Sequence, residues 1–150
     1  MARFKPTLLV IDDDLDTLEL LKIELESAGY GVLTADSWNE ARNRIQYAFD
    51  SKLAINGIIL DLMMPIHSGF DVLRSLPVMM DPAPPVIVLS ALTSLDDNIK
   101  AREMGAMKYL TKPTSRKALL DAVKEALKVG IKSTWRDLKN WRKEGWEKEG

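Results

Sequence analysis

The feature of this chain that most restricts its fold is a regular alternation of short apolar runs with longer helical patterns. Five runs have the length of strands and are rich in branched apolar residues: 7–11, 31–35, 56–60, 85–90 and 107–111. Five segments between and after them have helical spacing: 15–29, 37–51, 69–76, 95–106 and 115–130. Parallel strands need long, usually helical, connections, so this alternation predicts an α/β fold with a parallel sheet.

The predicted sheet has five parallel strands with helices on both faces, because continuously apolar strands are typical of sheets that are covered twice. Right-handed crossovers leave few ways to wind such a chain, and the flavodoxin-like order 2-1-3-4-5 is the natural choice. Ser37 and Glu40 match a capping box at the start of one helix. Gly29, Gly105 and Gly130 are typical stop signals for three others.

Composition narrows the class of protein further. A length of 150 residues fits one ordinary domain, and a net charge of −1 argues against bulk electrostatic binding of nucleic acid. The chain has no cysteine and no apolar run near twenty residues, so we expect neither disulfides nor a membrane span. Acidic residues follow the first apolar run at once, unlike a signal peptide. We therefore expect a cytoplasmic protein.

The last twenty residues differ from the body of the chain. We divide the chain into a domain over 1–130 and a tail over 131–150. The tail carries six basic residues, four acidic residues and three of the four tryptophans. Ile131, Trp135, Leu138 and Trp141 fall on one side of a helix, which predicts a C-terminal helical extension. It packs back on the body or frays, or it forms a homodimer or partner surface, for which tryptophan is well suited. Contact with nucleic acid or membrane is the weakest alternative, because four acids oppose the six basic residues.

Polar side chains stand where four of the predicted strands end. Asp12, Asp13 and Asp14 follow the first strand, and Asp61 follows the third. Ser90 ends the fourth strand, and Lys112 with Pro113 follows the fifth. In the predicted order these four strands are consecutive neighbours, and functional groups of such sheets gather beyond their carboxyl ends. We therefore expect these side chains to lie together.

The expected cluster favours phosphoryl chemistry assisted by a divalent cation. Crowded carboxylates resist ionising together, and Mg²⁺, which prefers one or two carboxylates plus phosphate oxygens, relieves that repulsion. Lys112 adds a point charge suited to phosphate, and Ser90 adds a hydroxyl. Carboxylates are known nucleophiles that form aspartyl-phosphate. The set is therefore suited to hold a phosphoryl group on one of its carboxylates.

Each piece also has a simpler interpretation. Asp13 or Asp14 suits the N-cap of the first helix, and one acid of the run can cap while others bind metal. A calcium loop starting at Asp12 would need glycine where Thr17 stands and glutamate where Ile23 stands. A haloacid-dehalogenase-type phosphatase would need a hydroxyl residue or valine where Asp16 stands. His67 lies in a predicted turn, where a solvent-exposed loop residue is a better interpretation than a phosphate relay.

With these residues in place, the chain resembles the receiver domain of bacterial response regulators. The matching stretches are LLVIDDD, IILDLMMP with Gly69, VIVLSA and YLTKP, in the order of the family, over roughly 6–129. By this resemblance, Asp61 is the phosphoacceptor. Asp12 and Asp13, with Asp61 and the backbone carbonyl of Met63, are expected to bind Mg²⁺.

The resemblance also implies the remaining site residues. Lys112 corresponds to the phosphate-pairing lysine, and the Lys112–Pro113 peptide bond is expected to be cis. Ser90 and the adjacent Ala91 correspond to the phosphate-binding and switch positions, and Tyr109 corresponds to the switch aromatic. Phosphorylation would draw the Ser90 hydroxyl inward, let Tyr109 follow, and shift the face formed by helix 4, strand 5 and helix 5.

The chain departs from the commonest family pattern at two places. Thr114 follows Lys-Pro where phenylalanine is usual, and Met107 and Lys108 replace an acidic pair that often precedes the switch aromatic. The second change puts in doubt a salt-bridged homodimer through the helix 4–strand 5–helix 5 face. Met63, two residues after Asp61, is bulky and apolar, and we hypothesise that it shields an acyl phosphate from water.

The predicted function is a phosphorylatable signalling switch of a two-component system, not an enzyme acting on a separate substrate. The expected partners are a sensor histidine kinase and a downstream protein, without direct nucleic-acid or membrane binding. The alternative function is a constitutive protein-interaction module that has the same fold and does not use phosphate. A metal-dependent hydrolase is a more distant alternative, because the predicted loops are too short to bind a substrate.

Overall fold

A computed structural model of the chain describes residues 5–128. The elements, in chain order, are β1 (Thr7–Ile11), α1 (Leu15–Ser27), β2 (Gly31–Ala35), α2 (Trp38–Asp50), β3 (Gly57–Leu60), α3 (Gly69–Met79), β4 (Val86–Ser90), α4 (Leu95–Glu103) and β5 (Lys108–Thr111). Residues 116–128 form a further helix, called here the last helix. The predicted tail, 131–150, lies outside the described residues.

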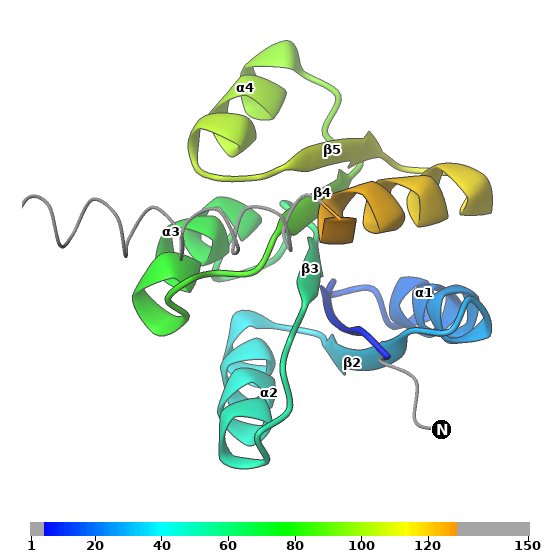
Figure 1. Cartoon of the computed structure of the whole chain (residues 1–150). Helices are drawn as coiled ribbons and strands as arrows, with labels where there is room; N and C mark the ends of the chain where they lie inside the picture. The colour runs from blue at the N-terminus through cyan, green and yellow to red at the C-terminus, as the bar shows by residue number, and fades with distance from the viewer. Residues whose placement is uncertain (1–4, 129–150) are drawn as a thin grey trace, which may run out of the picture.

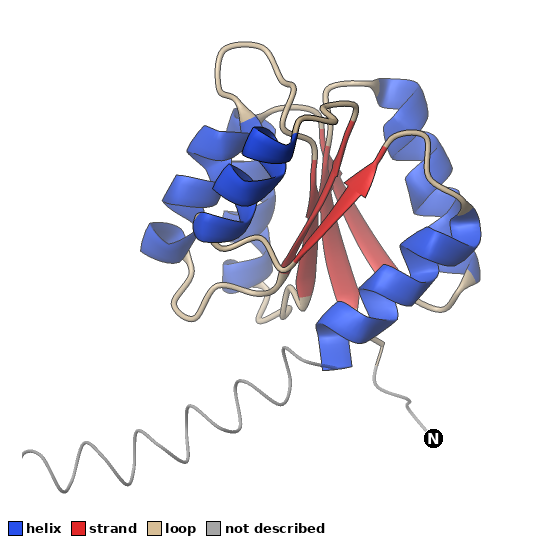
Figure 2. Ribbon diagram, turned by 90° about the horizontal axis from the view of Figure 1, so that it is seen from above, coloured by secondary structure: helices blue, strands red, loops and turns tan. Residues whose placement is uncertain are grey.

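The five strands form one parallel sheet in the order β2-β1-β3-β4-β5, as predicted (Figure 1). Helices cover both of its faces (Figure 2). Side chains alternate along each central strand: Leu9 and Ile11 of β1 pack on the face covered by α2, α3 and α4. Leu8 and Val10 pack on the face covered by α1 and the last helix.

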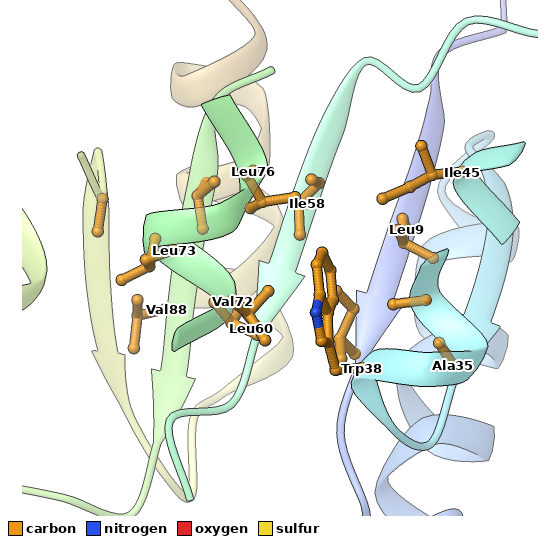
Figure 3. Close-up of a cluster of buried hydrophobic side chains, with 14 of the residues drawn as sticks. Leu9, Ala35, Trp38, Ile45, Ile58, Leu60, Val72, Leu73, Leu76 and Val88 are labelled. Carbon is orange, nitrogen blue, oxygen red and sulfur yellow. The ribbon is translucent and has the colours of Figure 1, made fainter. Parts of the chain in front are cut away.

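The larger core lies on the α2–α3–α4 face. Trp38 and Ile45 of α2 and Leu76 of α3 pack against Ile58 and other apolar residues of the central strands (Figure 3). All four side chains are buried. This packing fixes β1 and β3 firmly, and their carboxyl ends carry the acidic residues of the predicted site.

The helix boundaries differ most from the prediction at α3 and α4; α4 ends at Glu103, three residues before the predicted end at 106. The α3 helix was expected to end at residue 76, ahead of Pro77, but it continues to Met79. Pro77 lies on the exposed side, and the cap residue Met80 still donates its N–H to the carbonyl of Leu76 at 2.8 Å. The missing N–H of proline therefore does not end the helix at this position.

The predicted capping box at α2 is only half formed. The Ser37 hydroxyl accepts the N–H of Glu40 at 3.1 Å, but the Glu40 carboxylate accepts the N–H of Asp36 instead of that of Ser37. A complete box occurs at α3, between Ser68 and Asp71. Among residues 5–128, no helix is both long enough and apolar enough to cross a membrane.

Candidate functional site

Three carboxylates meet at the carboxyl edge of the sheet. Ile11 of β1 is paired with Leu60 of β3, so the next residues, Asp12 and Asp61, emerge side by side. One oxygen from each of Asp12, Asp13 and Asp61 lies within 4.8 Å of the others. Asp12 is only 2% exposed and Asp61 only 5%, whereas Asp13 is open to solvent. The sheet register therefore brings together the acids that the sequence placed at two strand ends.

Lys112 joins two of these carboxylates. Its Nζ atom lies 2.6 Å from Asp12 Oδ2 and 3.1 Å from Asp61 Oδ2. The backbone N–H of Lys112 donates to the carbonyl of Ser90 at 2.8 Å, which continues the β4–β5 ladder and aims the side chain inward. The Lys112–Pro113 peptide bond is cis, as the resemblance implied. The ammonium group thus lies between the two buried acids.

The electrostatics of this cluster follow from burial and from the shared ammonium. Burial raises the pKa of Asp12, and the hydrogen bond from Lys112 only partly offsets that rise. Burial by itself would lower the pKa of Lys112, but hydrogen bonds to Asp12 and Asp61 and their negative charges outweigh it, so the net pKa is raised. Lys112 is therefore charged at neutral pH, and the Asp12 carboxylate favours additional positive charge beside it.

The second oxygen of each buried carboxylate accepts a hydrogen bond from the backbone N–H two residues later. Asp12 Oδ1 accepts the N–H of Asp14 at 2.9 Å, and Asp61 Oδ1 accepts the N–H of Met63 at 3.0 Å. Both carboxylates are therefore fixed in orientation by backbone on one side and by Lys112 on the other. The Met63 side chain is 52% exposed at this edge. The role predicted for the Met63 carbonyl as a metal ligand stays a prediction.

The donor set fits a hard divalent cation. Asp12, Asp13 and Asp61 offer closely spaced carboxylate oxygens, and Asp12 is buried at a cost that a nearby cation would reduce. Oxygen ligands without sulfur or imidazole favour Mg²⁺ over softer metals. The chemistry and spacing of these residues are therefore compatible with the predicted Mg²⁺ site.

Asp14 has a different structural role from Asp12 and Asp13. It is the N-cap of α1, where its carboxylate accepts the Thr17 hydroxyl at 2.7 Å and the N–H of Asp16 at 3.3 Å. The hydrogen bond from Thr17 is the largest cause of the lowered pKa of Asp14. The capping interpretation of the acidic run thus applies to Asp14, and metal binding by Asp12 and Asp13 stays a prediction.

Gly69 holds the segment that follows Asp61. Its N–H donates to the carbonyl of Leu62 at 3.0 Å. A Cβ atom at this position would lie 2.4 Å from the carbonyl oxygen of Asp61 and 2.5 Å from the Cα atom of Leu62. Only glycine permits the first turn of α3 to approach the backbone of Asp61 this closely.

The predicted switch residues Ser90 and Tyr109 are both hydrogen-bonded to the backbone of Leu92, a residue that the sequence did not identify. Leu92 donates its N–H to the Ser90 hydroxyl at 3.3 Å and accepts the Tyr109 hydroxyl at its carbonyl at 2.8 Å. Ser90 is fully buried, Ala91 is exposed, and Tyr109 is half-buried, with its pKa raised by burial. Leu92 acts through its backbone, so no residue-type signal pointed to it.

Two further predictions concern residues beside the site. His67 is exposed in the β3–α3 loop, as expected for a solvated loop residue. Lys108, which stands in place of a commonly acidic residue, contacts Glu125 of the last helix, with 2.9 Å between Nζ and Oε2. This departure from the family pattern therefore forms an ion pair between β5 and the last helix.

Comparison with known proteins places these features in context. Residues 8–124 match the model of a family described as the response regulator receiver domain. The chain is 40% identical over 124 residues to the transcriptional regulatory protein PrrA of Mycobacterium leprae, covering 82% of this chain and 50% of PrrA. It is 33% identical over 133 residues to GlrR of Escherichia coli, covering 87% of this chain and 29% of GlrR. The chain thus spans half or less of these curated relatives.

Solved structures agree with the fold. A CheY-like receiver domain protein from Methanospirillum hungatei superposes with a TM-score of 0.77 at 26% identity, covering 87% of this chain and 99% of that one. A receiver domain protein from Clostridium thermocellum gives a TM-score of 0.72 at 35% identity, covering 82% of this chain and 94% of that one. The similarity extends over nearly the whole length of both solved chains.

Proposed function

This chain belongs to the response regulator receiver domain family, and we propose that it is a phosphoacceptor switch in which Asp61 carries the phosphoryl group. Receiver domains act in two-component signalling. Residues at the carboxyl ends of β1, β3, β4 and β5 supply the side chains that the proposal needs. These groups are Asp12, Asp13, Asp61, Ser90 and Lys112.

The observation that carries the proposal is the position of Lys112 between Asp12 and Asp61. A lysine at 2.6 and 3.1 Å from two buried carboxylates supplies the cation that a transferred phosphoryl group also needs. A phosphoryl group on Asp61 would bring about two negative charges next to this ammonium. Lys112 can turn from carboxylate to phosphate without leaving the site.

The proposed transfer is an in-line displacement. A carboxylate oxygen of Asp61 attacks phosphorus, a P–O bond forms, and the P–N bond to the histidine of the donor breaks. The departing imidazole then takes up a proton. Such reactions depend chiefly on positioning and on neutralising charge. The backbone N–H of Met63 and the ammonium of Lys112 hold the Asp61 carboxylate in place for this attack.

Mg²⁺ would be held by Asp12, Asp13 and Asp61, with the Met63 carbonyl proposed as a further ligand. When bound, the ion would neutralise negative charge on the carboxylates and on the transferred group. The chain's own contribution is to keep Asp12 buried and oriented through the N–H of Asp14 and through Lys112.

The proposed output is a shift of the α4–β5–last-helix face. Ser90 and Tyr109 are both hydrogen-bonded to Leu92, at the start of the connection to α4. If the Ser90 hydroxyl turns to a phosphoryl oxygen, Leu92 loses that partner, and its hold on Tyr109 changes with it. The change would reach α4, and from there a downstream protein or a second copy of the chain.

The rival function is an interaction module that does not use phosphate. A module of that kind has no need for two buried carboxylates joined by one ammonium, because such clusters seldom add stability over apolar packing. The observed burial of Asp12 and Asp61 therefore favours the phosphoacceptor function.

The proposal is tested by the intact mass of the chain after incubation with acetyl phosphate and Mg²⁺. We expect one added phosphoryl group on the unaltered chain and none on Asp61→Asn, which keeps the size of the side chain but removes the nucleophile. An unaltered chain that gains no phosphoryl group, and that also fails to bind a beryllofluoride mimic, would favour the constitutive module.

A further inference from the structure

The connection from α3 to β4 exposes a run of apolar side chains. Residues 78–85, with the sequence VMMDPAPP, contain one polar side chain, that of Asp81. Val78 is 86% exposed and Met79 is 41% exposed. Pro82 and Ala83 are exposed as well, and the remaining apolar residues of the run are half-buried. We call residues 78–85 the proline segment. Single exposed apolar residues are common, but seven in one short stretch indicate a surface that is covered in the working protein.

The two ends of the proline segment are fixed to the domain. The N–H of Met80 donates to the carbonyl of Leu76 at 2.8 Å, and the carbonyl of Pro85 accepts the N–H of Ile58 at 2.9 Å. Between these points, the proline rings restrict φ. The segment therefore has little conformational entropy to lose when another part of a protein covers it.

The last helix ends beside the proline segment. A Cβ atom at Gly57, the first residue of β3, would lie 3.4 Å from Leu127 Cδ2 and 3.8 Å from the carbonyl oxygen of Pro85. Leu127 and Pro85 are therefore close neighbours across the start of β3. In Figure 1 the orange end of the last helix lies beside β3 and β4. The chain thus leaves the described domain next to the proline segment, at the edge of the sheet where the strands begin.

The sequence beyond residue 128 is long enough and apolar enough to cover the segment. It includes the tail, 131–150, with Trp135, Trp141 and Trp146. Trp135 stands seven residues after residue 128, a distance of about 10 Å in a helix or about 25 Å in an extended chain. Because residue 127 is already a neighbour of Pro85, tryptophans at these positions can reach the proline segment.

The chemistry of the two segments is complementary. Aromatic side chains are the usual partners of proline-rich stretches, and methionine sulfur also packs favourably against aromatic rings. The tail carries six basic and four acidic residues, whereas residues 1–130 carry 15 basic and 18 acidic residues. Their net charges are therefore opposite, and the one charge within the proline segment, on Asp81, is negative.

We propose that the tail covers the proline segment of its own chain. Its tryptophans would pack on Val78, Met79 and Pro82, and its basic residues would lie near Asp81. A helix with an apolar stripe, as the tail is predicted to be, needs an apolar surface of this kind to be stable. The inference does not depend on phosphorylation, because the proline segment and Asp61 lie at opposite edges of the sheet.

The test places a fluorescent reporter on the proline segment of the full chain. Because the chain has no cysteine, bimane labels Ala83→Cys at that position alone, and contact with tryptophan quenches bimane. The labelled chain is compared with one in which Trp135, Trp141 and Trp146 are also replaced by phenylalanine. The matched control is Leu95→Cys, because Leu95 is 72% exposed but lies at the start of α4, at the carboxyl edge.

We expect replacement of the three tryptophans to raise bimane emission from Ala83→Cys by at least about twofold, because a tail that covers the segment most of the time quenches most of the emission. Emission from Leu95→Cys should not change. Unchanged emission from Ala83→Cys, or an equal rise at both positions, would overturn the inference. Quenching that disappears on dilution would also overturn it, since the tail of a second copy would then cover the segment.

A second measurement needs no label. Val78→Lys puts a charge on the proline segment without disturbing the core, because Val78 is 86% exposed. We expect it to release the tail, so that tryptophan emission moves to longer wavelength and acrylamide quenches it more strongly, while Trp38 stays buried. Ile23→Lys, at a branched residue of α1 that is 60% exposed, should change neither property. Equal emission from Val78→Lys and the unaltered chain would contradict the proposal.

Discussion

The two edges of the sheet are formed by the same strands but differ in the kind of polar contact that they bury. At the amino edge, the polar contact beside β1 and β3 is neutral and complete: Thr7 and Asn56 exchange two hydrogen bonds, of 2.9 and 2.8 Å. At the carboxyl edge, the same two strands end in buried carboxylates that share one ammonium. One edge satisfies its polar groups with neutral hydrogen bonds, and the other joins charged side chains of three different segments of the chain.

The difference indicates that the carboxyl edge is the less stabilising of the two. Burying charge costs free energy even when the charges are paired, whereas a neutral hydrogen bond between a side chain and the backbone costs little. Ile66, whose φ of +69° is rare for a branched residue, and the close approach at Gly69 also lie at the carboxyl edge. A region that departs from local optima in three independent ways is expected to be a functional site.

Lys112→Met, at the carboxyl edge, should have the largest effect on stability. It leaves Asp12 and Asp61 buried without their cation, so we expect the free energy of unfolding at pH 7 to fall by about 3 kcal/mol. The loss should shrink as pH falls through the raised pKa of Asp12, because that carboxyl then becomes neutral. Urea denaturation at several pH values measures both effects.

The amino edge supplies the control for Lys112→Met. Asn56→Ala removes the acceptor of the buried Thr7 N–H and should cost about 1 kcal/mol, without lowering the rate of phosphorylation by acetyl phosphate. Lys112→Met should lower that rate. Equal effects of the two variants on phosphorylation would remove the distinction between the edges.

Gly69→Ala should have the next largest effect. The new Cβ atom would clash with the backbone of Asp61 and Leu62, which cannot give way as a side chain can. We expect a loss of about 2 to 3 kcal/mol in the free energy of unfolding and slower phosphorylation. Gly57→Ala, at the other end of β3, meets chiefly the end of the Leu8 side chain and should be milder in both respects. A milder Gly69→Ala would contradict this account.

Asp12→Asn should change stability in the opposite direction. Burial raises the pKa of Asp12, so its ionised form destabilises the folded state, and that cost is present above its folded-state pKa. Without Mg²⁺, the substitution should raise the free energy of unfolding at pH 7 by about 1 to 2 kcal/mol, since Lys112 keeps Asp61 as a partner.

The pH dependence sharpens the prediction for Asp12→Asn. The advantage of the variant should disappear as pH falls through the raised pKa of Asp12, because the unaltered chain then becomes neutral there too. Mg²⁺ binding, measured by calorimetry, should be weaker in the variant. A variant less stable than the unaltered chain at pH 7 would show that the ion pair with Lys112 outweighs the burial.

Met63→Asn should have the smallest effect, and it acts on kinetics. The exposed thioether is proposed to shield the acyl phosphate, so its loss should speed dephosphorylation by roughly three- to tenfold, about 1 kcal/mol of barrier. The half-life of the phosphorylated chain, followed by intact mass, measures this. An unchanged half-life would mean that Met63 does not exclude water.

Much of the fold could be predicted from the sequence, because apolar periodicity and strand length are local properties. The strands matched to within one residue at each end, since runs such as TLLVI have no competing interpretation. The helix α3 was predicted too short: it continues through Pro77, which lies on the exposed side, to Met79. Local sequence did not reveal which side of α3 would face solvent.

The cluster of charged residues at the carboxyl edge was predicted from the sequence, but its contacts were not. Asp12, Asp61 and Lys112 stood out as charged residues at strand ends, and strand order then brought them together. The bridging position of Lys112, the double use of Leu92 and the positive φ of Ile66 depend on tertiary geometry or on backbone atoms. Residue types and spacing carry no signal for such features.

The most direct test of the central claim is to locate the phosphoryl group on the chain. The chain is phosphorylated with acetyl phosphate and Mg²⁺, the acyl phosphate is reduced with borohydride, and peptides are mapped by mass spectrometry. Reduction converts a phosphorylated aspartate to homoserine. We predict homoserine at Asp61 alone, with Asp12 and Asp13 unchanged. Homoserine at Asp12 or Asp13, or at no aspartate of the chain, would contradict the account.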